Sequence, residues 1–178
     1  MNTVVVLRAT QKILRSLPQS EGELGASHNA LGDWYVNRMV IDRRPLLLIV
    51  SSKSRLAIVT PARDVKALPS RLAQIVGERL KRLPVSEAVV ASEVEATGHV
   101  GVGKTIDRSV TGQLVDFAKA LPYYLPVDGW DEATLRTAEE KLAETPCRSS
   151  RPFAEVIWPS RTAVELLTAA WPASRVRH

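Results

Sequence analysis

Three apolar segments lie between residues 34 and 60, and only three residues separate each segment from the next. The segments are Trp34–Ile41, Pro45–Ser51 and Arg55–Thr60, joined by Asp42-Arg43-Arg44 and Ser52-Lys53-Ser54. Connections this short join antiparallel neighbours, because a parallel crossover needs about a dozen residues or more. The sequence therefore predicts a three-stranded antiparallel meander over residues 34–60.

Other patterns place further strands and helices around this meander. Apolar steps of three and four predict a helix over residues 65–83, which Pro69 divides into a short first turn and a main helix. Strands are expected over 3–9 and 99–104, and helices over 10–17, 106–121, 131–142 and 160–171. Residues 86–96 fit either a helix or a strand. We expect one α+β domain over residues 1–178, with a mainly antiparallel sheet of about four or five strands packed by helices. Residues 146–178 are expected to be a C-terminal connection and helix packed on that domain.

Composition excludes several classes of protein. Since no apolar stretch approaches the roughly 20 residues of a membrane-spanning helix, no membrane protein is expected. The first residues show no export signal, which favours a cytoplasmic, bacterial-type protein. Cys147 is the only cysteine, and His28, His99 and His178 are the only histidines. We therefore expect no internal disulfide, no metal site, no cofactor and no catalytic residue of a recognised type.

The basic residues of the chain are concentrated in one block. The formal net charge is +5, but residues 36–82 alone hold eleven bases against three acids. Clustered bases attract phosphate-bearing partners, although a charge run is also compatible with ordinary solvated faces. With aromatic residues at only 5%, contact with a duplex or a phosphate backbone is favoured over a platform that stacks single strands. The candidate nucleic-acid contacts are Arg43, Arg44, Lys53, Arg71, Arg79, Lys81 and Arg82, with Arg55 as a further exposed base of the meander turns.

Residues Gly98–Thr105 read GHVGVGKT and match the P-loop pattern of nucleotide-binding proteins. A P-loop also needs a buried parallel strand before its first glycine and a later apolar strand that ends in an acid. The preceding Val94-Glu95-Ala96-Thr97 is short and polar, and no later apolar run ends in Asp or Glu. A nucleotide-binding P-loop is therefore disfavoured.

Three separated motifs carry a resemblance to a known family. They are Ala9–Leu14 (ATQKIL), Leu31–Asn37 (LGDWYVN) and Lys104–Gly112 (KTIDRSVTG). In these motifs the chain resembles an uncharacterised bacterial domain family of unknown function, built around TQK, LGDWYAN and KTxxRSVLG. The match extends over roughly residues 3–145. The resemblance implies a fold but no activity, and it implies that Lys104-Thr105 belongs to a motif without a P-loop.

Polar residues of these motifs form the candidate ligand site. Cations near a helix start, beside aromatic rings, can bind a phosphate or carboxylate and stack a planar group. The alternative is that each side chain holds its own backbone or fills the core. The candidate ligand-binding residues are Thr10, Lys12, Trp34, Tyr35, Asn37, Lys104, Thr105, Arg108 and Ser109.

We therefore predict a non-enzymatic binding or regulatory module that recognises an anionic partner, with nucleic acid as one candidate. One alternative is a small metal-independent enzyme that acts on a phosphate-containing substrate. Another is a protein-interaction or homo-oligomerising module that docks through residues 153–171. The acid pair Glu139-Glu140 is expected to lie solvated on the polar side of its helix.

Overall fold

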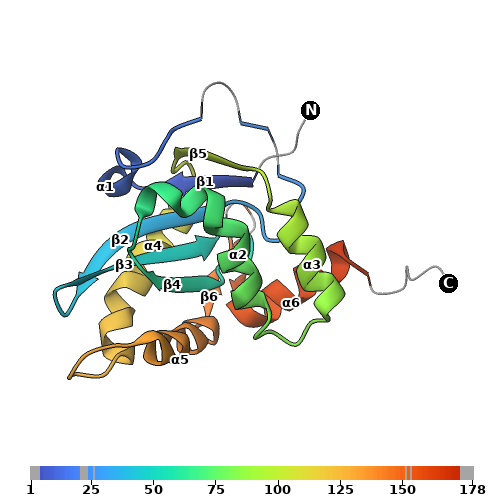
Figure 1. The fold of residues 1–178 in the computed structure, drawn as a ribbon. Coiled ribbons are helices and arrows are strands. Elements are labelled where there is room, and N and C mark those ends of the chain that lie inside the picture. The colour runs from blue at the N-terminus through green and yellow to red at the C-terminus, as the bar shows by residue number, and fades with distance from the viewer. Residues whose placement is uncertain (1–4, 21–23, 26, 151, 153, 173–178) are drawn as a thin grey trace.

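A five-stranded sheet forms the centre of the computed structural model, which describes residues 5–20, 24–25, 27–150, 152 and 154–172 (Figure 1). The strand order is β4-β3-β2-β1-β5. The strands are β1 (Val5–Ala9), β2 (Trp34–Ile41), β3 (Arg44–Ser51), β4 (Ala57–Pro61) and β5 (Val100–Lys104). Strands β2, β3 and β4 pair antiparallel, which confirms the predicted meander and, with the helices, the α+β class.

The N-terminal strand β1 lies inside the sheet, between β2 and β5. It runs parallel to both neighbours, so Leu7 pairs with Trp34 on one side and with Val102 on the other. The carboxyl ends of β1 and β5 therefore meet at one end of the sheet. The residues that follow these two strands, which belong to the first and third motifs, are brought close together.

Helices cover both faces of the sheet. They are α1 (Gln11–Leu14), α2 (Leu68–Leu80), α3 (Glu87–Ala96), α4 (Arg108–Ala120), α5 (Glu132–Ala143) and α6 (Pro159–Ala170), with short 3₁₀ turns at Val65–Ala67 and Leu121–Tyr124. Helices α1, α2, α3 and α6 pack against one face, and α4 and α5 against the other. In Figure 1, α2 lies in front of the sheet and α4 lies behind it. Each face thus has its own apolar core.

Local sequence signals explain most helix boundaries. Pro69 falls in the first turn of α2, directly after the separate 3₁₀ turn, as predicted. The carboxylate of Asp107 caps α4, and that of Asp131 caps α5 in a reciprocal capping box with Thr134. Ser86 caps residues 87–96, which are helical and not a strand.

The connection that follows α5 contains a small hairpin that was not predicted from the sequence. Strands β6 (Cys147–Arg148) and β7 (Val156–Ile157) pair antiparallel. Ile157 packs against the core beneath α4 and α5, whereas Trp158 is 36% exposed and lies over Arg161. Phe153, the first residue of the segment 153–171 that was considered for docking, lies outside the described residues.

Candidate functional site

The second motif contacts both the first and the third near the ends of β1 and β5. The Tyr35 hydroxyl accepts a hydrogen bond of 3.1 Å from the backbone N–H of Asp107. The Thr10 hydroxyl donates one of 2.6 Å to the carboxamide oxygen of Asn37. Positions 10, 35 and 107 therefore belong to one region of the molecule, because β1 is parallel to both of its neighbours.

A closed polar network forms around the start of α4, and we call it the Asp107 corner. One carboxylate oxygen of Asp107 accepts from the N–H of Ser109 at 2.8 Å, and the other accepts from the Ser150 hydroxyl at 2.7 Å. The guanidinium of Arg55 donates through Nη2 to the hydroxyls of Ser109 and Ser150, at 2.9 and 3.0 Å, and through Nη1 to the carbonyl of Ser52. The corner thus ties α4, the β3–β4 turn and the segment after β6 together.

The two charged groups of the Asp107 corner differ in exposure, because Arg55 is buried and Asp107 is only partly buried. Arg55 is fully buried, so its expected place among the exposed bases is wrong, and burial lowers the pKa of its guanidinium while Asp107 opposes that shift. Burial alone would raise the pKa of the Asp107 carboxyl. Hydrogen bonds from Ser150 and from the N–H of Ser109, together with the charge of Arg55, outweigh burial and hold that pKa below its ordinary value. The acid therefore stays ionised as a helix cap.

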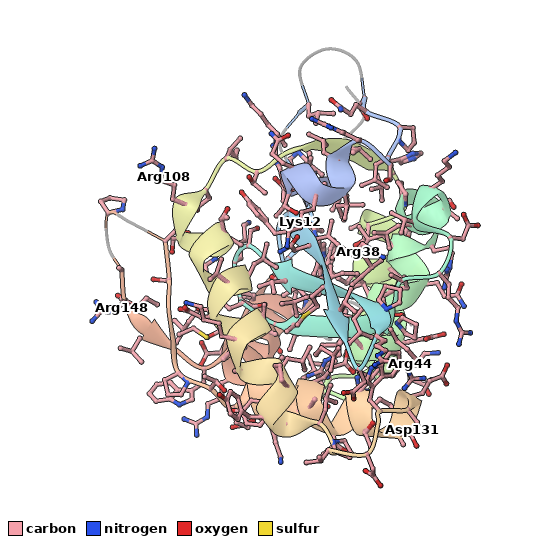
Figure 2. The ribbon with its side chains drawn as sticks, turned by 90° about the vertical axis from the view of Figure 1, so that its left-hand side faces the viewer. Lys12, Arg38, Arg44, Arg108, Asp131 and Arg148 are labelled. Carbon is pink, nitrogen blue, oxygen red and sulfur yellow. The ribbon has the colours of Figure 1, made fainter. Side chains whose placement is uncertain are left out.

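The remaining candidate ligand residues do not gather around this corner. Trp34 is fully buried in the core beneath α2, on the face opposite to Tyr35, because neighbouring strand residues point to opposite faces. These two rings therefore do not form one stacking surface. Lys12 lies on α1, whereas Arg108 extends outward at the edge of the molecule (Figure 2). Lys104 is exposed at the end of β5, and Thr105 is half-buried.

The P-loop pattern is not a loop in this structure. Residues Val100–Lys104 form strand β5, and α4 begins only at Arg108. Gly101 and Gly103 thus lie in a strand that pairs with β1, and the N–H of Gly98 donates to the carbonyl of Glu95 at the end of α3. The glycines therefore do not form a loop that could wrap a phosphate.

A groove of about 590 Å³ lies between α2 and α5 along β4, the edge strand of the sheet. We call it the α2–α5 groove, and its lining residues are Ile58, Val59, Thr60, Pro61, Arg71, Ile75, Glu78, Arg79, Lys81, Arg82, Glu132, Leu135, Arg136 and Glu139. Four of the seven candidate nucleic-acid contacts are in this set. Helix α5 adds a fifth cation through Arg136. This groove is where the structure brings the predicted bases together.

An ionic network lies at the base of the groove. Glu139 accepts from the N–H of Val59 at 2.8 Å and from Nη2 of Arg82 at 2.6 Å. Glu140 lies 2.8 Å from Nη1 of Arg82 and 3.3 Å from Nη1 of Arg79. Since the contact with Val59 uses an outward N–H of β4, the network also covers an edge that would otherwise pair with another strand.

Arg79 is the least satisfied member of this network. Its side chain is 1% exposed, and its Nε donates to the carbonyl of Ala57 at a long 3.4 Å. Within the described part of the chain, neither Nη1 nor Nη2 has a hydrogen-bond partner. Burial lowers the pKa of the Arg79 guanidinium and raises that of the Glu139 carboxyl, while the opposite charges around each group oppose these shifts. The terminal N–H groups of this buried cation thus have no hydrogen-bond acceptor among the described residues.

The other three candidate nucleic-acid contacts lie elsewhere. Arg44 stacks on the ring of Trp130 at 3.6 Å and donates to its carbonyl, which fixes the β2–β3 hairpin against the start of α5. Arg43 is exposed in the tip of that hairpin, and Lys53 is exposed in the β3–β4 turn. These bases do not extend the groove into one continuous basic face.

The expectation that both acids of the Glu139-Glu140 pair are solvated is wrong for Glu139, whose side chain is 5% exposed, against 50% for Glu140. A signal for this burial was present in the sequence. Glu139 lies four residues after Leu135 and three before Leu142, so it shares the apolar side of α5. No comparable local signal marked Arg55, whose burial depends on contacts with residues 109 and 150.

Across residues 5–20, 24–25, 27–150, 152 and 154–172, no group of three or more His, Cys, Asp and Glu side chains is arranged to hold a metal ion. Over the same residues, none of the helices has the length and apolarity needed to cross a membrane.

Comparison with known proteins identifies a family but no activity. Residues 6–162 match the family model described as "Domain of unknown function (DUF6933)". No curated protein matches the chain. Among solved structures, the catalytic core domain of BIV integrase is similar with a TM-score of 0.47 and 16% sequence identity, over 74% of this chain and 93% of that one.

Proposed function

The chain belongs to this family of unknown function, and we propose that it is a binding module that holds an anionic partner in the α2–α5 groove. The observation that carries this proposal is Arg79, a buried cation whose two terminal nitrogens have no acceptor among the described residues. Buried donors are normally paired, and leaving one unpaired costs roughly 1–3 kcal/mol. An anion that reached Arg79 would recover part of that free energy.

The surroundings of Arg79 support an anionic ligand. Arg71, Lys81 and Arg136 line the same groove and are exposed, so they are free to attract an anion electrostatically. The acids Glu78 and Glu132 also line it. They oppose a long polyanion that follows the whole groove, and they favour one anionic group placed at its base. A phosphate of a nucleic acid is one source of such a group.

The test uses two probes at low salt, a short fluorescein-labelled DNA duplex and inorganic phosphate as its competitor. We expect saturable binding that weakens in Arg71→Ala and in Lys81→Ala, because both remove exposed cations from the groove. For a duplex, a variant that makes one phosphate contact fewer should have a slope of log K against log salt that is smaller by roughly 0.9. Fluorescence anisotropy measures both quantities.

Arg38→Ala is the matched control, since Arg38 is an exposed arginine on β2 outside the groove (Figure 2). It should bind like the wild type. If the wild type, Arg71→Ala, Lys81→Ala and Arg38→Ala all bind the duplex with equal affinity, the anionic contact lies elsewhere. That result would overturn the assignment to the groove. If neither probe binds at low salt, the proposal of an anion-binding module fails altogether.

A further inference from the structure

Glu139 and Glu140 make contacts of different quality with the arginines Arg79 and Arg82 of the α2–α5 groove. Glu139 is buried and held through both carboxylate oxygens, one by the N–H of Val59 and the other by Arg82. Glu140 is half exposed, and both of its ion-pair contacts use the same oxygen, Oε1. Glu139 is thus fixed in the structure, whereas Glu140 can turn out into solvent without leaving a buried charge of its own.

Glu140 also fails to satisfy Arg79. Its Oε1 lies 3.3 Å from Nη1, but without the geometry of a hydrogen bond, and Nη1 and Nη2 both lack an acceptor among the residues that the structure describes. A carboxylate in bidentate geometry would accept hydrogen bonds from two guanidinium nitrogens at once. The charge of Arg79 is therefore compensated, while its hydrogen-bonding capacity stays unused.

We propose that the Glu140 carboxylate is an internal stand-in for the anionic group of the ligand, which displaces it and takes its place between Arg79 and Arg82. This inference rests on the proposed function and adds to it a ligand chemistry and a mode of regulation. The ligand presents a compact oxyanion, such as a phosphate or carboxylate, with at least two oxygens that can accept from Nη1 and Nη2 of Arg79. Because one anion replaces another, the two arginines keep a neutralising partner in both states.

The exchange makes Glu140 a built-in competitor. While its carboxylate remains beside the two arginines, an incoming oxyanion gains only the difference between its own contacts and those of Glu140. A ligand that accepts one poorly aligned hydrogen bond from Arg79 gains little binding free energy over Glu140. A ligand that accepts from Arg79 with two oxygens gains more. Glu140 would thereby disfavour anions that make only one hydrogen bond to Arg79.

The experiment measures binding of inorganic phosphate to the wild type, Glu140→Gln, Glu140→Asp and Glu144→Gln. Titrations are followed by the NMR signal of the Arg79 Nε–H group, and thermal melting confirms that each variant is folded. A partly exposed ion pair is worth up to about 1 kcal/mol, so removing the competing carboxylate should tighten phosphate binding about three- to fivefold. Glu140→Asp keeps the charge but shortens the side chain, and it should also bind phosphate more tightly than the wild type.

Glu144→Gln is the control for net charge, since Glu144 is an exposed glutamate one turn further along, where it accepts from the Ser160 hydroxyl and not from an arginine of the groove. It should leave affinity near that of the wild type. If all three variants bind phosphate more tightly by the same factor, the effect comes from electrostatics in general. The proposal that Glu140 occupies the place of the ligand anion is then wrong. If the wild type binds phosphate but neither Glu140 variant binds it more tightly, the stand-in is also wrong, while the proposed function stands. If no protein binds phosphate or duplex, the proposed function fails and this inference fails with it.

Discussion

Two arginines are buried in this molecule, Arg55 in the Asp107 corner and Arg79 in the α2–α5 groove, and they differ in what satisfies them. Arg55 uses both terminal nitrogens, on two hydroxyls and a carbonyl, and leaves only Nε without a partner among the described residues. Arg79 uses Nε and leaves both terminal nitrogens without one in that same part of the chain. The first arrangement is typical of an internal crosslink, and the second has capacity left for a ligand.

The difference also lies in the position of the acid. In the corner, Asp107 is held by hydrogen bonds from Ser109 and Ser150, and its position is needed to cap α4. Beside the groove arginines, Glu140 is half exposed and caps nothing in α5, whose cap is Asp131. A buried arginine alone therefore does not mark a binding site. Under our proposal, the marker is a buried arginine with unused hydrogen-bonding capacity whose nearby acid is half exposed.

The largest effect on stability is expected at Arg55. Arg55→Met removes the donor that joins residues 109 and 150 and leaves Asp107 with less compensation for its charge. Removing one partner of such a buried polar network should lower the free energy of unfolding by about 3 kcal/mol. Urea denaturation measures it. A variant as stable as the wild type would show that the corner is not an internal crosslink.

A smaller loss is expected at Asp107. Asp107→Ala removes the cap of α4, which should lower the free energy of unfolding by about 1 kcal/mol at neutral pH. Because folding lowers the pKa of this acid, its ionised form stabilises the fold above its unfolded-state pKa, near 4, and that contribution is lost as the pH falls through the lower folded-state value. Denaturation of both proteins between neutral pH and about pH 3 should show their curves converging towards acid. Parallel curves would contradict this role.

The smallest stability effect is expected at Arg79. Arg79→Met replaces a poorly satisfied buried cation by an apolar side chain of similar length. The two carboxylates nearby keep a cationic partner in Arg82, and Glu140 is half exposed, so no buried charge is left unpaired. We expect a change in the free energy of unfolding within about 1 kcal/mol, against a large loss for Arg55→Met. Similar losses in the two methionine variants would remove the distinction between the corner and the groove.

The parts of the fold that depend on neighbours in sequence were predictable. Short connections define the meander, and in the structure they run over Asp42-Arg43 between β2 and β3 and over residues 52–56 between β3 and β4. Pro69 marks the start of α2, and Asp107 and Asp131 stand where a helix cap is needed. Each of these signals acts over a few residues, so a single sequence is enough to detect it. The small hairpin formed by β6 and β7 has strands of two residues each, too short for any periodic signal.

The candidate sites were harder to predict, because they depend on contacts between distant segments. The parallel pairing of β1 with β2 and β5 brings the motifs together, and nothing local in residues 5–9 specifies those partners. Alternation along β2 could have separated Trp34 from Tyr35, since the two rings must point to opposite faces. The contact between Arg79 and Glu140 likewise joins α2 to α5, and no local signal pairs those two helices.

The most direct measurement is the affinity of Arg79→Met for inorganic phosphate and for the labelled duplex, compared with that of the wild type at low salt. Because charge-assisted hydrogen bonds contribute about 1.5–3 kcal/mol, we expect the variant to remain folded and to bind at least about tenfold more weakly. A folded Arg79→Met protein that binds both probes as tightly as the wild type would contradict the assignment of the α2–α5 groove as the anion site.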